Sequence, residues 1–189
     1  HAGFQASRMS DTQIATLVGC AVLVFWTVGA YNRLTALRHD IGKAFVPVDA
    51  QVQHRHTLLL QWVEGLRALL DQAPQLHDAL LMACGQLQAA CDALRVRPSA
   101  RSAATSLRLA EEALASARSR LLAELPARQQ GLSGLEIEVN SEQLAAADNT
   151  LAFARAQFNT AIQTYNDAIR QIPTRLVASV FGFQAAGTL

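Results

Sequence analysis

Apolar residues recur at steps of three and four along residues 144–172, which is the period of one face of an α-helix. The positions of this stripe are Leu144, Ala147, Leu151, Ala154, Phe158, Ile162, Tyr165, Ile169 and Ile172. Asn140 with Ser141 offers an N-cap and Pro173 ends the pattern, so we predict a helix over about 141–172. A stripe this long is not stable in water by itself and requires partner helices of comparable length.

The same period predicts these partner helices at about 32–70, 74–96 and 100–125. We expect Pro47 to kink or briefly break the first of them, because proline lacks a backbone donor and clashes with the preceding turn. Residues 126–140, with Gly131 and Gly134, are predicted to form the one long loop. The fold class is therefore all-α, an antiparallel four-helix bundle over residues 32–173.

Composition agrees with helices and narrows the function classes. Alanine and leucine dominate, and only 6% of residues are aromatic. The net charge is +1 and the basic residues are scattered, which argues against a nucleic-acid partner. Three cysteines give no disulfide framework. Cys84 and Cys91 are seven residues apart, about 10 Å along one helix, so we expect buried thiols.

The segment ahead of the bundle has no charged residue between Asp11 and Arg33. About twenty apolar residues span a bilayer, so residues 13–31 are predicted to be a transmembrane anchor, with Trp26 and Tyr31 suited to an interface. The anchor residues are Ile14, Leu17, Val22, Leu23, Val24, Phe25 and Trp26.

Other readings of this segment stay open. A cleaved signal peptide could end at residues 28–30, and residues 17–20 resemble a lipoprotein cleavage box, but both lack a preceding basic region. A buried core helix is the third alternative. Residues 1–12 are interpreted as a lead outside the fold. Because Arg33, Arg38 and Lys43 follow the run, the positive-inside rule predicts a single-pass protein with a cytoplasmic bundle.

The apolar tail, residues 174–189, should return to the membrane-proximal end, since four antiparallel helices bring the chain back to its start. Leu176, Val177, Val180, Phe181 and Phe183 are more apolar surface than one helix face hides. They are expected to pack on the base of the bundle, enter the lipid headgroup layer, or contact a neighbouring subunit. Arg170 and Arg175 suit anionic lipid or an acidic neighbour.

Both ends of the chain resemble the LemA family. The residues that carry the resemblance are Gly29-Ala30-Tyr31-Asn32-Arg33-Leu34, Ala44-Phe45, Arg55-His56, Ala154-Arg155-Ala156-Gln157-Phe158-Asn159, Tyr165-Asn166-Asp167-Ala168-Ile169-Arg170, Pro173 and Ala178-Ser179-Val180-Phe181-Gly182-Phe183. The resemblance covers about 13–70 and 140–186. It implies a bacterial single-span membrane protein with a four-helix domain, and no established reaction.

The chain departs from the family pattern in three places. Phe45 stands where the family has tryptophan, residues 57–63 replace a proline-containing family run, and no Tyr-Pro segment precedes the last long helix. The sequence is thus identified as a divergent member.

Candidate chemistry is sparse. His54 and His56 point about 200° apart on a helix and cannot share one metal ion, so these and His77 are interpreted as surface histidines. Phosphate-loop, zinc-protease and nucleophile-elbow motifs are absent from the sequence. We therefore predict no catalytic residue, no metal and no cofactor.

Asn159 and Asn166 are seven residues apart on one helix face, with Tyr165 beside them. Asparagine is a mediocre helix former, so the pair needs a reason. The first interpretation is interhelical hydrogen bonds that fix register, supported by Asn32 next to Tyr31 in the neighbouring helix. A binding surface is the alternative.

The sequence taken as a whole favours a membrane-anchored, non-enzymatic scaffold or interaction module. Its expected partners are membrane lipid, further copies of itself in a homo-oligomer, and an unidentified protein. A membrane-anchored sensor that binds a ligand is the alternative, and an enzyme or metal protein is a third.

Overall fold

The computed structural model describes residues 10–128, 134–171 and 173–189, without side chains for 126–128 and 134–140. Six helices follow one another: α1 (Asp11–Gly65), α2 (Arg67–Leu70), α3 (Pro74–Val96), α4 (Arg101–Arg128), α5 (Gly134–Arg170) and α6 (Thr174–Phe181). The described residues contain no strand, so the predicted all-α class is confirmed.

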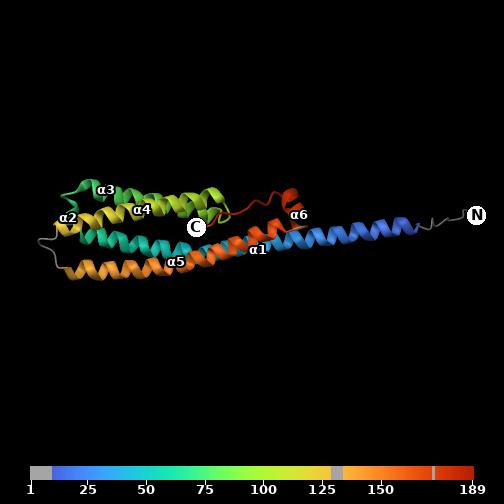
Figure 1. Ribbon diagram of the computed structural model, residues 1–189, viewed down its shortest axis with the longest axis horizontal. Helices are drawn as coiled ribbons and strands as arrows, with labels where there is room; N and C mark the ends of the chain where they lie inside the picture. Colours follow the sequence, from blue (N-terminus) through green and yellow to red (C-terminus); the bar gives the residue numbers. More distant parts are fainter. Residues whose placement is uncertain (1–9, 129–133, 172) are drawn as a thin grey trace, which may run out of the picture.

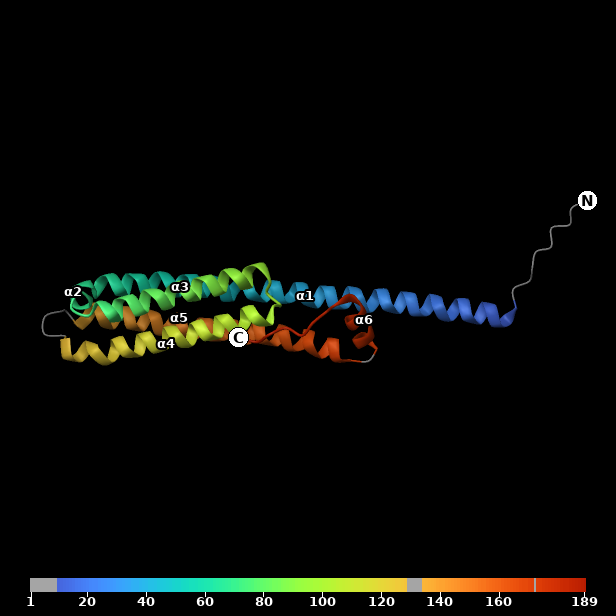
Figure 2. The same ribbon diagram turned by 90° about the horizontal axis from the view of Figure 1, so that it is seen from above.

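The four long helices run antiparallel to their neighbours in the chain (Figures 1 and 2). α1 packs along α5, and α3 packs along α4. The two pairs lie against each other, and one apolar core runs between them. The stripe of the last long helix is buried as predicted, at Leu144, Ala147, Leu151, Ala154, Phe158, Ile162 and Tyr165. The rings of Phe45 and Phe158 meet edge to face at 5.9 Å, which joins α1 to α5.

α1 begins at a capping box, in which Ser10 accepts from the Gln13 backbone and the Gln13 side chain accepts from the Ser10 backbone. It then runs without interruption through Pro47, so the expected short break is absent; a bend at Pro47 stays a prediction. The helix predicted to reach residue 70 ends at Gly65 instead. Leu66 leaves helical geometry (φ −95°, ψ 4°), and its N–H is shared between the Trp62 and Val63 carbonyls at 3.1 and 3.2 Å.

The long loop predicted over residues 126–140 is wrong. α4 continues to Arg128 and α5 begins at Gly134, so Asn140 and Ser141 lie inside a helix and are not its N-cap. Between Gly134 and Ser141 the only strong helix breaker in the sequence is Gly134 itself, and the helix can extend back to it. Gly131 and Ile172, which the sequence interpretation also used, lie outside the described residues.

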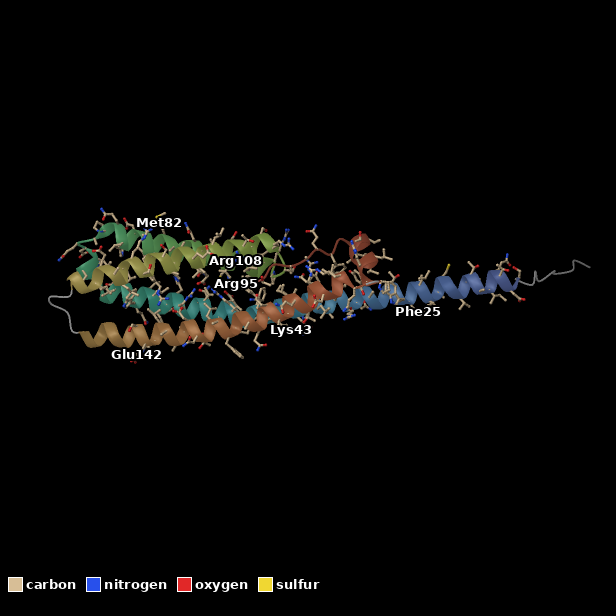
Figure 3. All side chains as sticks on the ribbon, in the orientation of Figure 1. Phe25, Lys43, Met82, Arg95, Arg108 and Glu142 are labelled. Carbon is tan, nitrogen blue, oxygen red and sulfur yellow. The ribbon has the colours of Figure 1, made fainter. Side chains whose placement is uncertain are left out.

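The N-terminal part of α1 projects beyond the bundle, and Figure 3 shows Phe25 on it, away from the other helices. Ile14, Leu17, Val22, Leu23, Val24 and Phe25 are 48–79% exposed. Among the described residues α1 is the one helix long and apolar enough to cross a membrane. None of its most apolar 18-residue stretch is buried inside the structure. This exposure does not fit the core-helix alternative. Residues 1–9 of the predicted lead lie outside the described residues, while Asp11 and Thr12 belong to α1.

Cys84 and Cys91 are free, buried thiols on α3, as predicted. Burial raises the pKa of Cys91 to about 12, and the nearby carboxylates Asp49 and Glu111 add to the shift. Both thiols therefore contribute to the core as small apolar side chains at neutral pH.

We predict that alkaline pH destabilises the bundle through Cys91. The folded protein keeps the thiol proton after the unfolded chain, with a pKa of 9.0, has lost it. Between pH 9.0 and about 12, each pH unit should therefore lower the free energy of unfolding by up to ~1.4 kcal/mol. Denaturant titrations at pH 8 and pH 10 measure this loss, and Cys91→Ala should lose less between the two pH values. An equal loss in both proteins contradicts the assignment.

Candidate functional site

The C-terminal residues meet α1 where it leaves the bundle, because α6 folds back onto α1 at that point (Figure 1). The Tyr31 ring of α1 lies 5.0 Å from the Phe181 ring and 5.7 Å from the Phe183 ring. Arg33 of α1 donates to the Gln171 amide oxygen at 3.5 Å, beside the end of α5. The expected return of the tail to the start of the bundle is thus present in the fold.

α6 is amphipathic, with a face toward the bundle and a face toward solvent. Thr174, Val177 and Ala178 are buried, and Phe183 is half-buried beside Tyr31. Leu176, Val180 and Phe181 remain 66, 78 and 53% exposed. The base of the bundle therefore covers only part of the predicted apolar tail. Leu176 and Val180, four residues apart, are left on one side of this two-turn helix beside the exposed Arg175, whereas the Phe181 ring is turned toward Tyr31.

Gly182 ends α6 in the left-handed region, at φ 71°. The Phe183 N–H then donates to the Ala178 carbonyl five residues back, at 2.9 Å, which closes the helix end. From here residues 183–189 leave the helix without regular secondary structure and turn back along the bundle (Figure 2).

Asn159 and Asn166 hold this tail by its backbone. The Asn166 amide donates to the Ala186 carbonyl at 3.0 Å and accepts from the Ala186 N–H at 2.8 Å. The Asn159 amide makes the same pair of bonds with Leu189, both at 2.7 Å. The prediction that these asparagines form interhelical hydrogen bonds is therefore wrong, because both amides bind the backbone of the tail. Asn32 is exposed on α1.

A cavity of about 200 Å³ lies beside the start of the tail. Its walls include Gln184 and Ala185 of the tail, the buried Tyr165 of α5, and three arginines, Arg38, Arg97 and Arg101. Burial raises the pKa of Tyr165, against the opposing charge of Arg38. Arg170 and Arg175, predicted to face lipid or an acidic neighbour, are exposed near the same end.

A second polar cluster lies inside the bundle, away from this end. Arg55 of α1 forms ion pairs with Glu111 of α4 and, at 3.2 Å, with Asp148 of α5. Arg118 of α4 also pairs with Asp148, at 2.8 Å, and Arg155 of α5 with Glu111, at 2.7 Å. Five charges thus join three helices. We call these residues the ion cluster.

The sequence interpretation missed the ion cluster, although a signal for it exists. Glu111 and Arg118 are seven residues apart on α4, and Asp148 and Arg155 are seven apart on α5. In two antiparallel helices such pairs place each acid opposite the other helix's arginine. Arg55 was noted only as part of the family resemblance, and its side chain is 6% exposed. Burial disfavours its charge, but Glu111 and then Asp148 outweigh burial and raise the pKa of Arg55.

The geometry of the ion cluster favours a structural role, in which it joins α1, α4 and α5. Its two carboxylates are each shared by two arginines, so neither is available as a base without breaking an ion pair. In the described part of the chain no group of three His, Cys, Asp or Glu side chains could hold a metal. His54 is exposed, His56 is half-buried, and the His77 imidazole lies 3.6 Å from the Asp78 carboxylate.

Comparison with known proteins decides the family. The LemA family model matches residues 44–189, well over half of the chain. The chain belongs to the LemA family. The match includes both asparagines, the tail and the middle of the chain, where the sequence resemblance was not recognisable. The Gly29–Leu34 motif precedes the matched residues. A search of curated proteins finds no match.

We predict that Glu111→Gln lowers the free energy of unfolding by about 3 kcal/mol, because it leaves the buried Arg55 and the half-buried Arg155 with too little negative charge nearby. Glu112→Gln, at the exposed neighbouring position, is the control and should change stability by less than about 0.5 kcal/mol. Denaturant unfolding followed by far-UV circular dichroism measures both. Equal effects of the two substitutions contradict a structural role for the ion cluster.

Proposed function

We propose that this LemA-family protein is a membrane-anchored, non-enzymatic scaffold that associates with further copies of itself at the bacterial inner membrane. The observation that carries the proposal is the common location of two exposed apolar surfaces. The projecting part of α1 and the outer face of α6 lie at the same end of the bundle, joined by the contacts of Tyr31 with Phe181 and Phe183.

The projecting part of α1 supports the anchor. Its apolar side chains lie outside the bundle, and its length suffices to cross a bilayer. Because α1 continues without a break into the core, such an anchor would hold the bundle directly. Arg33, Arg38 and Lys43 then favour a cytoplasmic bundle.

The outer face of α6 supports self-association. Burying Leu176 and Val180 is worth roughly 1.5–3 kcal/mol for each side chain, so a contact that covers them is favourable. Copies anchored in one membrane carry α6 at the same height, and these faces can meet. Lipid contact by the same side chains, with Arg175 at anionic headgroups, is the competing outcome.

Replacing Leu176 and Val180 together by Gln should yield a smaller particle in mild detergent with helicity unchanged, because the buried face of α6 and the contact of Phe181 with Tyr31 are left intact. Size-exclusion chromatography with light scattering measures the particle. Met82→Gln and Leu109→Gln together form the matched control, since these side chains are 66 and 58% exposed on other helices.

A particle of unchanged size excludes self-association through α6. Flotation with anionic vesicles then tests the lipid alternative, which predicts weaker flotation of the α6 variant. Loss of helicity instead assigns these side chains to the fold.

The topology makes a separate prediction. In a Cys20→Ser background, Ala68→Cys places an exposed thiol on α2, while Cys84 and Cys91 stay buried. A membrane-impermeant maleimide should label this thiol in inverted membrane vesicles and leave it unlabelled in intact cells. Labelling in intact cells reverses the proposed orientation.

A further inference from the structure

Asn159 and Asn166 bind the backbone of two tail residues at a fixed spacing. Asn159 and Asn166 are seven residues apart on α5, about 10 Å along the helix axis. Ala186 and Leu189, which they bind, are three residues apart, which is also about 10 Å in an extended chain. Each amide pairs with both the N–H and the C=O of one residue. These bonds fix an extended conformation and depend on no side chain of the bound segment.

The side of α4 that faces the tail selects small residues. A Cβ on Gly187 would lie 3.0 Å from the Arg101 Cα and 3.0 Å from the Ala104 Cβ, so a branched side chain cannot fit there. Ala186 is 4% exposed and belongs to the core, so a larger side chain there would have to displace its neighbours. Leu189 is half-buried against the core. The groove therefore fits a segment of the pattern small–Gly–any–apolar in extended conformation.

The bound segment is held to the bundle by contacts that can break without unfolding a helix. Residues 183–189 follow the left-handed Gly182 and form no helix or strand. Their polar attachment to α5 consists of the four asparagine hydrogen bonds. Breaking these bonds can thus release residues 184–189 without unfolding a helix, while Phe183 stays on Tyr31, and six extended residues reach about 20 Å.

We propose that the tail groove, formed by Asn159 and Asn166 of α5 with Arg101 and Ala104 of α4, is a peptide-binding site whose partner is residues 184–189 of a second copy. This inference deepens the proposed self-association and rests on it. Every copy carries both the groove and the segment that fits it, so exchange of the tail replaces each intramolecular bond by an identical one between copies. Confinement of anchored copies to one membrane raises their local concentration and favours exchange.

A complementation experiment with two full-length proteins tests the proposal. Asn159→Ala with Asn166→Ala removes the groove contacts and keeps the tail. Gly187→Val prevents the tail from fitting the groove and keeps both asparagines. The two proteins carry different affinity tags and are co-expressed, and co-purification is compared among the mixed pair and the two like pairs. The α6 face is intact in all three pairs, so any difference reports tail exchange.

We expect the mixed pair to co-purify at least fivefold more than either like pair, because only this pair combines a working groove with a working tail. Asn149→Ala and Thr188→Val, at exposed positions on the same helix and the same tail, should leave the wild-type level unchanged. Equal recovery in all three pairs overturns the proposal. If Gly187→Val lowers the far-UV helical signal, Ala186→Lys serves as the tail-deficient protein.

A peptide measurement separates this inference from the proposed function. A labelled peptide of residues 183–189 should bind saturably to full-length Gly187→Val protein, whose own tail is excluded from the groove. Adding Asn159→Ala and Asn166→Ala, or replacing the peptide glycine by valine, should weaken binding at least tenfold. Peptide binding by a protein that stays monomeric refutes self-association and supports the groove as a peptide-binding site. Binding that does not depend on the asparagines refutes the groove, whatever the oligomeric state.

Discussion

The ion cluster is the constraint that sets how the helices of this bundle face one another. Apolar stripes of alanine and leucine tolerate sliding by a heptad, because one small or branched side chain packs much like the next. The ion pairs of Glu111 and Asp148 do not tolerate such sliding, since a slipped register would leave their arginine partners without a counter-charge. The same register brings the start of α4 beside the second half of α5. Arg101 and Ala104 thereby come to face the segment that Asn159 and Asn166 bind.

Periodicity predicted most of the fold because the helices bury their stripes against each other. Phe158, Ile162 and Tyr165 are at most 1% exposed, as the three-and-four spacing requires. Helix ends were less predictable. Asn140 and Ser141 form a plausible cap in sequence, but no breaker stands behind them until Gly134, and continued helical hydrogen bonding prevails. At the same end of the bundle, Leu66 leaves helical geometry although the periodic pattern continues through it.

The candidate site was only partly predictable. The spacing of Asn159 and Asn166 showed that they share a face, but a period cannot tell what lies opposite that face. Their partner is backbone, and any sequence can supply backbone carbonyls and N–H groups, so no residue pattern marks it. The sequence alone gives no reason to single out Gly187 among the glycines. The close approach of the Arg101 backbone gives it a role, and that approach exists only in the folded chain.

The unbroken course of α1 has a geometric consequence. A helix rises about 1.5 Å per residue, so the stretch from Tyr31 to Gly65 is about 50 Å long. With the projecting part in a bilayer, the molecule would stand as a narrow column, and the α2 corner would lie some five nanometres above the lipid surface. A stiff column of this kind works as a spacer. If copies associate as proposed, they would touch along the bundle and near α6, and a partner bound at the α2 end would be held at a fixed height from the membrane.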